Sequence, residues 1–367
     1  MSAPLMAASA RSYELPFRAA VRAGAPRARR GWLLELEDRD GARGWGEAAC
    51  WPGFGAGEAR TAADLTRLSV WLPGRDPRAA LAELGGDPYG DLAPEARCAA
   101  ETALLDLIAR REGLPLAERL EPGAARAARV QALVADAEEA AALRAQGVRC
   151  FKLKVGDPED AARDARRARA VRDAIGPEAA LRLDANGAWP DAARALRALE
   201  ALAASAPEWV EQPLPPGDLA AFAALRRRAP VALALDEGLR GAADLEAALR
   251  LAAADAVVLK PMFVGGPLVA QALGRRARAA GLRVVFGHAH ESAVGRAAVL
   301  HLAAASGGGE PAGLGSLLAR DLAPLGPLAG DALALPAGPG LGLSPSVSST
   351  DSPLPRRPVR CGPQEVP

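Results

Sequence analysis

Cys150-Phe-Lys-Leu-Lys-Val155 and Leu181-Arg-Leu-Asp-Ala-Asn-Gly187 frame the segment that decides the fold. Each begins with a short apolar run that is typical of a buried strand. Between them, residues 159–175 place apolar side chains three and four positions apart, as an amphipathic helix requires. Two strands joined by a helix form a β-α-β unit, in which the strands lie parallel. The sequence therefore predicts an α/β protein built on a parallel sheet.

The alternation of apolar run and helical stretch recurs from about residue 128 onward. Further helical stretches include residues 191–205, 242–254 and 267–280. Eight strands that alternate with helices fit a closed, TIM-like barrel. The predicted strands are residues 130–134, 151–155, 181–185, 209–211, 231–236, 256–260, 284–288 and 312–315. An open doubly wound sheet is the alternative, but no Gly-rich phosphate turn follows the first strand to support it.

Residues 1–125 follow a different pattern and are expected to form a separate α+β domain. Three segments alternate as antiparallel strands do, and a hairpin turn at 38–41 joins two of them. These strands are predicted at 13–15, 31–37 and 44–49, and helices at 56–72 and 94–112. The barrel is expected to span residues 126–320. The end of the chain is rich in Ser, Pro and Arg, so residues 345–367 are expected to be a disordered tail.

Composition excludes several classes of protein. The 367 residues include 45 Lys plus Arg against 44 Asp plus Glu, and the net charge of +1 argues against binding to nucleic acid or to a charged membrane surface. No apolar run reaches the roughly 18 residues of a membrane span, and no apolar signal core begins the chain. Four scattered cysteines show neither metal-ligand nor disulfide spacing. We expect a cytoplasmic protein, either a monomer or a homo-oligomer.

Lysine is almost absent from the chain. Only Lys152, Lys154 and Lys260 occur, all in short apolar segments, and every other basic residue is Arg. Arg stays protonated, whereas a Lys amine can lose its proton when its surroundings are tuned. Retention of Lys at these positions alone indicates that a titratable amine is needed there.

Three acidic residues follow the ends of neighbouring predicted strands: Asp184, Glu211 and Asp236. In a parallel barrel the carboxyl ends of the strands form the functional mouth. Three carboxylates without Cys or His are typical of a site for a hard cation, here Mg²⁺ with Mn²⁺ as the alternative. The second and sixth strands lie opposite in a ring of eight, so Lys260 is expected to face Lys152 and Lys154 across this site.

Amines that flank a divalent cation point to removal of a proton next to a carboxylate. The cation would stabilise the enediolate that forms. Free Lys titrates near about 10.4, while an effective base titrates near roughly 7–8. A neighbouring ammonium group and a cation both disfavour protonation and can supply this shift. The sequence thus predicts an enzyme that acts on a small anionic carboxylate.

Five motifs resemble the enolase superfamily, muconate-lactonizing-enzyme subgroup, over residues from about 13 to 340. They are Lys152-x-Lys154, Leu181-Arg-Leu-Asp-Ala-Asn-Gly-Ala-Trp189, Val210-Glu-Gln-Pro213, Leu235-Asp-Glu237 and Leu259-Lys-Pro261. The resemblance implies a (β/α)7β barrel with an N-terminal α+β capping domain, and we expect residues 321–344 to return and pack on that domain. Lysine bases that act beside Mg²⁺ are established chemistry of that superfamily.

Within the superfamily the chain is similar to the o-succinylbenzoate synthases of menaquinone biosynthesis, on Gly44-Trp-Gly-Glu47, Trp51-Pro-Gly-Phe54 and Glu291-Ser292. The resemblance implies a lyase that catalyses syn-dehydration of 2-succinyl-6-hydroxy-2,4-cyclohexadiene-1-carboxylate. Lys154 would be the base and then the acid, and Lys152 and Lys260 would be cations beside the enediolate. Asp184, Glu211 and Asp236 would hold Mg²⁺. Substrate contacts are expected from Arg182, Asn186, Gly287, His288, Glu291, Gly315 and Ser316.

Two segments depart from the family pattern and keep alternatives open. His288 and His290 stand where small hydroxyl residues are usual, and Gly313-Leu-Gly-Ser316 replaces a Gly-Leu-Gly-Thr-Gly motif. Racemisation of N-succinylamino acids and epimerisation of dipeptides are therefore the alternatives within the superfamily. Outside it stand zinc hydrolysis through the His-x-His pair, a Schiff-base aldolase that uses Lys260, and a binding protein without catalysis. The arginines of residues 27–30 are expected to lie in a solvated or substrate-covering loop.

Overall fold

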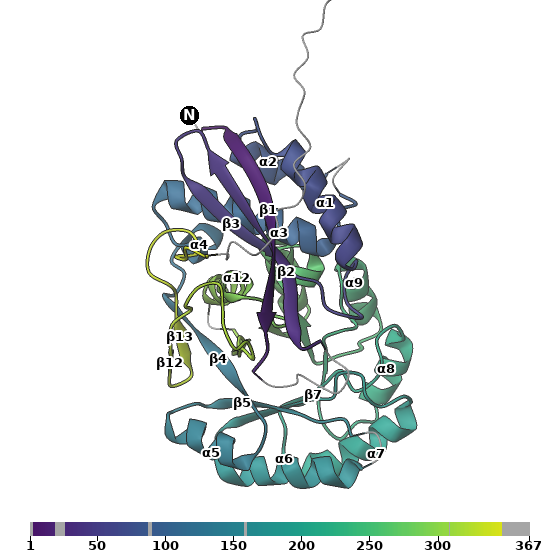
Figure 1. The fold of residues 1–367 in the computed structure, drawn as a ribbon. Coiled ribbons are helices and arrows are strands. Elements are labelled where there is room, and N and C mark those ends of the chain that lie inside the picture. Colours follow the sequence, from purple (N-terminus) through teal and green to yellow (C-terminus); the bar gives the residue numbers. More distant parts are fainter. Residues whose placement is uncertain (1–2, 19–25, 87–89, 158–159, 308, 347–367) are drawn as a thin grey trace, which may run out of the picture.

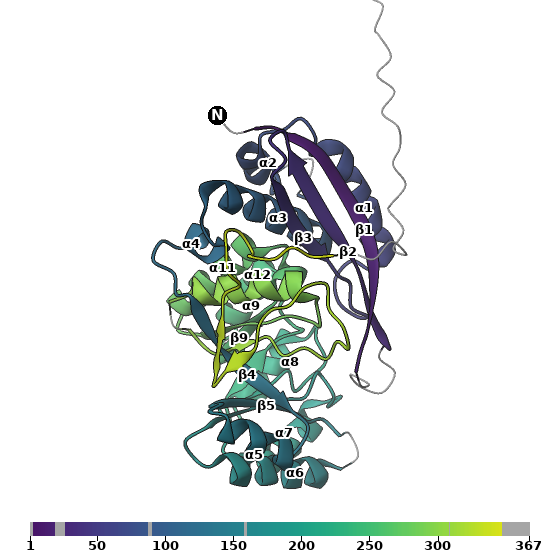
Figure 2. The same cartoon turned by 60° about the vertical axis from the view of Figure 1, so that its left-hand side comes forward.

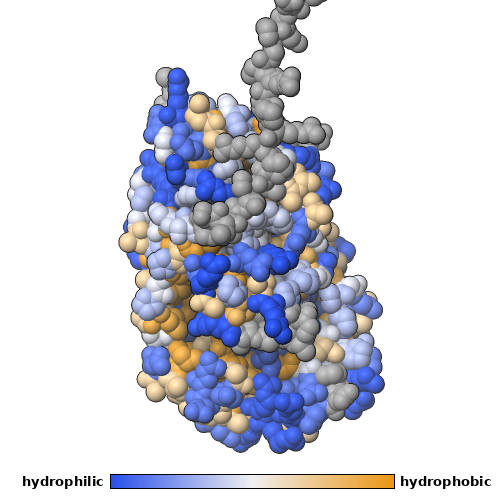
Figure 3. Space-filling model, viewed as in Figure 1, coloured by the Kyte–Doolittle hydropathy of each residue, from blue (hydrophilic) through white to orange (hydrophobic). Residues whose placement is uncertain are grey.

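The computed structural model describes residues 3–18, 26–86, 90–157, 160–307 and 309–346 (Figures 1 and 2). An N-terminal α+β unit lies at one end of the molecule, and barrel helices α5 (Ala137–Ala145), α6 (Ala161–Ile175) and α7 (Ala192–Leu202) lie at the opposite end. Of the expected disordered tail, residues 347–367 lie outside the described residues. Figure 3 shows hydrophilic residues spread over both parts of the visible face. No helix in the described ranges is long and apolar enough to cross a membrane.

The N-terminal unit is a three-stranded antiparallel sheet covered by helices. Its elements are β1 (Leu5–Pro16), β2 (Ala28–Asp38), β3 (Arg43–Ala48), α1 (Glu58–Trp71), α2 (Pro77–Glu83) and α3 (Pro94–Glu112). Helix α3 packs very closely on β3. A Cβ added at Gly46 would lie 1.9 Å from the carbonyl oxygen of Ala99, and one added at Gly44 would lie 2.2 Å from that of Ala103, so neither position has room for a side chain. This packing explains the two glycines of the Gly44-Trp-Gly-Glu47 motif.

Eight parallel strands close into a ring, as the sequence predicts. Hydrogen bonding joins β10 through β9, β8, β7, β6 and β5 to β4, and β11 pairs with β4 on its other side. A bridge between Gly287 and Gly313 completes the ring, so the alternative of an open sheet is wrong. The strands are β4 (Ala127–Val134), β5 (Cys150–Lys154), β6 (Ala180–Asp184), β7 (Trp209–Glu211), β8 (Leu233–Leu235), β9 (Ala256–Leu259), β10 (Arg283–Phe286) and β11 (Ala312–Gly313).

Helices between these strands cover the outside of the ring, and five of them begin at a residue whose side chain caps the first turn. Side chains of Asp136, Asp160, Asp191, Asp218 and Ser292 each accept a hydrogen bond from a backbone N–H of the first turn. The helices are α5 (Ala137–Ala145), α6 (Ala161–Ile175), α7 (Ala192–Leu202), α8 (Leu219–Arg226), α9 (Ala242–Arg250), α11 (Pro267–Ala279) and α12 (Ala293–Ala304), with the short α4 (Leu116–Leu120), α10 (Pro261–Val264) and 3-10 turn Ala203–Ser205.

After the last barrel strand, the chain contacts both parts of the molecule. The hairpin of β12 (Leu328–Ala329) and β13 (Ala332–Ala334) adds to β4 in an antiparallel arrangement. Further on, the backbone N–H of Leu341 donates to Asp106 Oδ1 of α3 over 2.6 Å, and Arg110 donates to the carbonyl of Leu343 over 2.6 Å. The return segment therefore spans from the barrel to α3 of the N-terminal unit.

The expectation of a solvated arginine loop at residues 27–30 is wrong for Arg29. Its side chain is 1% exposed and donates to the carbonyl oxygens of Ala49 and Cys50. It also lies over the ring of Trp51 at 5.3 Å. Residue 29 lies within β2, where side chains alternate between the two faces of the sheet, so this guanidinium turns inward while Arg30 is exposed.

Candidate functional site

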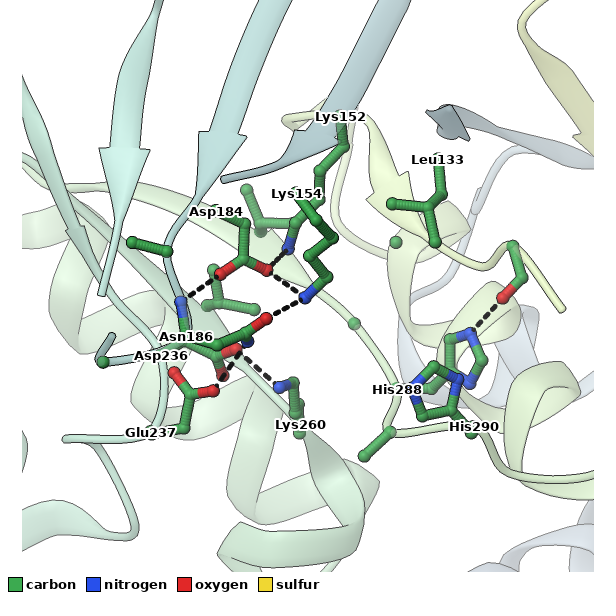
Figure 4. A pocket seen from close by; sticks show the side chains of 18 of the residues that line it. Leu133, Lys152, Lys154, Asp184, Asn186, Asp236, Glu237, Lys260, His288 and His290 are labelled. Atoms are coloured by element: carbon green, nitrogen blue, oxygen red, sulfur yellow. Dashed lines mark hydrogen bonds and ion pairs between the residues drawn. The ribbon is translucent and has the colours of Figure 1, made fainter. Parts of the chain in front are cut away.

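A cavity of about 520 Å³ lies at the carboxyl ends of the barrel strands. It is lined by barrel residues of β4, β5, β6, β9, β10 and β11 and of the turns that follow β5, β6, β8, β9, β10 and β11. Trp51 and Phe54 of the N-terminal unit contribute to its wall. Parallel barrels build their functional sites at this end, because the turns that follow the strands can vary without disturbing the ring. Figure 4 shows most of the side chains that line the cavity.

All three lysines of the chain reach this cavity. Lys152 and Lys154 lie two residues apart on β5 and project to the same side, as strand geometry requires. Lys260 directly follows β9 and approaches from a different direction (Figure 4). Its Nζ lies 2.6 Å from Asp236 Oδ2 and 5.5 Å from the ring centroid of Phe54. The structure thus brings the scarce lysines together at one place.

The three predicted carboxylates end or directly follow neighbouring strands and are buried. Asp184 is the last residue of β6, Glu211 is the last of β7, and Asp236 follows β8; their exposed fractions are 0%, 2% and 4%. Lys152 Nζ lies 2.7 Å from Asp184 Oδ2 and 2.7 Å from Glu211 Oε1. Lys154 Nζ lies 2.6 Å from the same oxygen of Asp184 and 2.6 Å from Asn186 Oδ1.

Burial and charge act against each other on the ionisable groups of this cluster. Burial alone would raise the pKa of Asp184, but the charges of Lys152 and Lys154 hold it well below its ordinary value. Burial also lowers the pKa of Lys152, yet the charges of Asp184 and Glu211 outweigh burial and leave that pKa raised. For Glu211, burial and the negative charge of Asp184 together raise the pKa. Asp184 and Glu211 thus share the ammonium group of Lys152.

The burial of Asp184, Glu211 and Asp236 at neighbouring strand ends fits a cation site formed by their carboxylates. In the described part of the chain, no group of three His, Cys, Asp or Glu side chains is already arranged around a metal position. Instead the ammonium group of Lys152 lies between Asp184 and Glu211. Buried oxygen donors of this kind, without sulfur or imidazole, have the chemistry that Mg²⁺ and Mn²⁺ prefer.

Histidines form another wall of the cavity, apart from the lysines and carboxylates (Figure 4). His288 Nδ1 lies 3.0 Å from Glu291 Oε2, and its Nε2 lies 2.9 Å from the carbonyl oxygen of Gly315. Burial would raise the pKa of Glu291, but contact with His288 brings it down to about 2. Burial and the charge of His288 lower the pKa of His290 to about 3, so this ring is neutral at ordinary pH.

The arrangement of the histidines does not support a zinc hydrolase. His290 contacts aromatic rings, with its centroid 5.0 Å from that of Trp51 and 5.6 Å from that of Phe17. His301, the third histidine of the chain, lies on α12 and accepts a hydrogen bond from the backbone N–H of Ala117. No cluster of metal-ligating side chains among the described residues includes these histidines.

Most of the predicted substrate contacts line the cavity, but Arg182 does not. Asn186, Gly287, His288 and Gly315 belong to the lining, and Glu291 lies directly behind His288. Ser316 follows Gly315 but is outside the lining, and its hydroxyl accepts a hydrogen bond from the backbone N–H of Leu318.

The prediction for Arg182 is corrected by its position in the barrel. It shares a face of β6 with Asp184 but lies two residues deeper, and its guanidinium reaches the opposite opening. There it donates to Glu208 over 2.9 Å and to Glu310 over 2.5 Å, and it stacks 4.2 Å from the ring centroid of Trp209. Its Nη1 also donates to Gln131 and to the carbonyl oxygen of Pro311, so Arg182 is 1% exposed and held by protein partners and not by the cavity.

Several lining residues were not predicted as site residues. Trp51 and Phe54 come from the N-terminal unit, and Gln131, Leu133, Glu237 and His290 come from the barrel. The Trp51-Pro-Gly-Phe54 segment places two aromatic residues around a turn, and this pattern is a signal in the sequence that could have indicated a contact with the cavity. Glu237 belongs to the Leu235-Asp-Glu237 motif. Its hydrogen bond with Asn186, however, joins residues 51 positions apart, and the local sequence does not indicate it.

Comparisons with known proteins agree with this geometry. The family described as "Enolase C-terminal domain-like" matches residues 135–349. An aromatic dipeptide epimerase of Herpetosiphon aurantiacus is 33% identical over 324 residues, which cover 84% of this chain and 88% of that protein. An o-succinylbenzoate synthase of Thermobifida fusca is 42% identical over 170 residues, which cover 46% of this chain and 52% of the synthase.

Solved structures give a similar result over a greater length. The crystal structure of N-succinyl Arg/Lys racemase from Bacillus cereus has a TM-score of 0.84 and 26% identity, with 94% of this chain and 96% of that chain covered. In the sequence comparison, the match spans only 45% of the racemase's length, and about half of the synthase's. The family match covers more than half of the chain and confirms the resemblance, so the chain belongs to the enolase superfamily.

Proposed function

We propose that the protein is an o-succinylbenzoate synthase, a lyase that uses Mg²⁺ in syn-dehydration of 2-succinyl-6-hydroxy-2,4-cyclohexadiene-1-carboxylate. The observation that supports this most is the convergence of the three lysines on buried carboxylates in one cavity. Such a cavity combines amines that can move a proton with oxygen donors for a divalent cation. The 42% identity with the Thermobifida fusca synthase favours this reaction, although the match covers half of that protein.

In this mechanism Lys154 takes the proton next to the substrate carboxylate and then returns it to the departing hydroxyl. The proton and the hydroxyl group leave from the same face of the substrate, so one amine can serve both steps. Lys152 and Lys260 remain ammonium groups and stabilise the enediolate through charge. Asp184, Glu211 and Asp236 would hold Mg²⁺, which when bound supplies positive charge where the carboxylate oxygens become more negative.

The remaining walls would hold the succinyl end of the substrate. Asn186, Gly287, His288 and Gly315 are the predicted contacts that the cavity provides, with Glu291 fixing His288 from behind. This part of the cavity disfavours a dipeptide, whose ammonium group needs an anionic partner. In the described wall formed by β10, β11 and the turns after them, the carboxylate of Glu291 is buried and already lies beside His288.

N-Succinylamino acid racemisation is the second candidate, and one observation favours it. Lys154 and Lys260 approach the carboxylates from different directions, as groups that exchange a proton on opposite faces must do (Figure 4). The Bacillus cereus protein with the similar structure is named as such a racemase. The two reactions are separated by measuring formation of o-succinylbenzoate beside exchange of the α-proton of both enantiomers of an N-succinylamino acid in D₂O. Exchange without any synthase activity would replace the first proposal by the second.

Metal dependence tests the chemistry that both candidates share. Exhaustive treatment with a chelator should abolish turnover, and added Mg²⁺ should restore it, because the buried carboxylates need a divalent cation. Substitution Asp236→Asn should weaken Mg²⁺ binding, measured by calorimetry, since it removes one charged ligand. Full turnover by protein shown to be free of metal would rule out the metal-dependent reaction.

A further inference from the structure

The amine proposed as the base is the least buried of the three lysines. The side chain of Lys154 is 41% exposed, against 13% for Lys152 and 14% for Lys260. A long, half-exposed side chain samples many rotamers, and holding it in one place costs entropy. Proton transfer requires the amine to be within hydrogen-bond reach of the proton it removes. Something in the site must therefore direct this nitrogen.

Two acceptors hold Lys154 Nζ among the described residues. One is Asp184 Oδ2 and the other is Asn186 Oδ1, both at 2.6 Å. An ammonium group has three N–H donors, so these contacts leave one position for the cavity. When the amine is neutral and keeps both hydrogen bonds, that same position is the lone pair that accepts a proton. The orientation of the Asn186 amide therefore decides where the reactive position points.

The Asn186 amide is itself held by Glu237. Its Nδ2 donates to Glu237 Oε1 over 2.9 Å. Because a carboxylate can only accept, the NH₂ end of the amide must face Glu237 and the oxygen must face Lys154. A flipped amide would place its NH₂ against the ammonium group of Lys154 and its oxygen against the carboxylate of Glu237, so both contacts would be repulsive. The backbone contributes as well, since Asn186 has φ of 46°, a region that Asn tolerates better than most residues.

Glu237 is suited to this task by its own surroundings. It is 8% exposed and directly follows Asp236 in the turn after β8. The side chain of Gln212 braces that turn, because its Oε1 accepts hydrogen bonds from the backbone N–H groups of Asp236 and Gly238, each over 3.1 Å. Oε1 of Glu237 is used by Asn186, whereas its Oε2 is buried without a hydrogen-bond partner in the described residues.

We infer that Glu237 is a positioning residue, which fixes the Asn186 amide and through it directs Lys154 at the substrate. The inference rests on the proposed role of Lys154 as the base, for either of the two candidate reactions. It links the ends of three strands, β8, β6 and β5, through one carboxylate, one amide and one amine. The spacing of the motifs predicts neither this role of Glu237 nor its contact with Asn186.

The test compares Glu237→Ala with Glu237→Gln. The alanine variant should lower kcat by about 10- to 100-fold, because a misdirected base loses transition-state geometry. Its KM should stay within about threefold, since ground-state binding does not depend on the aim of the base. The glutamine variant keeps an oxygen that can accept from Asn186 and should lose less than about threefold in kcat. Equal losses in the two variants would show that the charge of Glu237 matters, and would overturn the inference.

A double-mutant cycle with Asn186→Ala gives a second criterion. If Glu237 acts through Asn186, the double variant Asn186→Ala/Glu237→Ala should be about as slow as Asn186→Ala alone. Additive losses would contradict the inference. Glu208→Gln is the matched control, because this carboxylate also holds a partner inside the barrel but lies at the opposite opening, 2.9 Å from Arg182. A fall in kcat in the control as large as that in Glu237→Ala would indicate a structural effect.

Crystal structures of the wild type and both Glu237 variants decide the point without any assay. Lys154 Nζ should contact Asn186 in the wild type and in Glu237→Gln, and should leave it in Glu237→Ala. An unchanged Lys154 in the alanine variant would refute positioning. If the wild type turned over neither candidate substrate, the proposed function would fail, while these structures would still show whether Glu237 directs Lys154.

Discussion

At the scale of single residues, the same geometric rule predicts one part of the site and misleads in another. Side chains two positions apart on a strand share a face, and this rule places Lys152 and Lys154 together in the cavity. It also places Arg182 on the face of Asp184, but the rule says nothing about depth. Arg182 lies one layer deeper in the barrel than Asp184, and its guanidinium reaches Glu208 and Glu310 at the other opening. How deep a side chain lies relative to the cavity depends on where the cavity ends, and the local sequence carries no information about that.

Substitutions of two lysines by arginine should separate the candidate reactions. Arg keeps the positive charge but cannot act as a neutral base. Lys154→Arg should therefore lose more than about 10³-fold in kcat for o-succinylbenzoate formation, the upper range for acid–base catalysis. Lys260→Arg should retain measurable synthase activity, because syn-dehydration needs only a cation on that side. Racemisation needs both amines, so equal and complete loss in the two variants would favour it.

At the scale of secondary structure, the order of the elements was predictable but the ends of the barrel strands were not. Residues 231–236 are predicted as a strand, yet β8 ends at Leu235. Asp236 leaves the ladder because its backbone N–H donates to the side chain of Gln212 instead. Such a departure from regular pairing aims functional side chains at the mouth, and it depends on a residue from a neighbouring strand end. Hydrophobic periodicity therefore identifies the strand and not its last residue.

His301 shows how one side chain ties three elements together. It lies on α12 with 0% of its surface exposed. Its Nδ1 accepts from the backbone N–H of Ala117 in α4 over 3.0 Å, and its Nε2 donates to the carbonyl of Leu341 in the return segment over 3.3 Å. This pattern requires the neutral ring, since a protonated Nδ1 could no longer accept. Burial accordingly lowers the pKa of His301 to about 4.

Loss of stability in acid should follow from His301. An unfolded histidine titrates near about 6.5, so the folded protein binds fewer protons than the unfolded chain between that value and about 4. The contribution is complete above pH 6.5 and is lost as the pH falls toward 4, by about 3 kcal/mol at most. Gln can both accept from Ala117 and donate to Leu341, so His301→Gln should show a shallower pH dependence of unfolding free energy in denaturant titrations. Parallel curves for the two proteins would contradict this assignment.

At the scale of the whole molecule, every lysine lies in the cavity at the carboxyl ends of the barrel strands and none on the remaining surface. The chain order of strands and helices allowed the barrel to be predicted, because eight repeated units have few alternative closures. The contribution of the N-terminal unit to the cavity was harder to predict from the sequence. Trp51 and Phe54 reach the cavity through contacts with residues far away in sequence: the Phe54 ring centroid lies 5.1 Å from that of Phe263, and the Trp51 centroid lies 5.0 Å from that of His290.

Amine-specific labelling should therefore report on the cavity alone. Reductive methylation can modify only the three lysines and the α-amino group. Lys154 should react fastest, because its side chain is 41% exposed while those of the other two are below 15%. Bound o-succinylbenzoate should protect the lysines, with the α-amino group as the internal reference in peptide mass spectrometry. Unchanged labelling of Lys260 in the presence of saturating product would place it outside the binding site.

The ring is joined unequally around its circumference. Strands β5 and β6 pair over five residues, whereas β11 pairs with β4 over two and meets β10 only at the Gly287–Gly313 bridge. The seam of the barrel thus coincides with the wall that carries His288 and Gly315, and the well-joined arc carries Lys154 and Asp184. Opening the ring between β10 and β11 would therefore break a single bridge, whereas opening it between β5 and β6 would break a five-residue pairing.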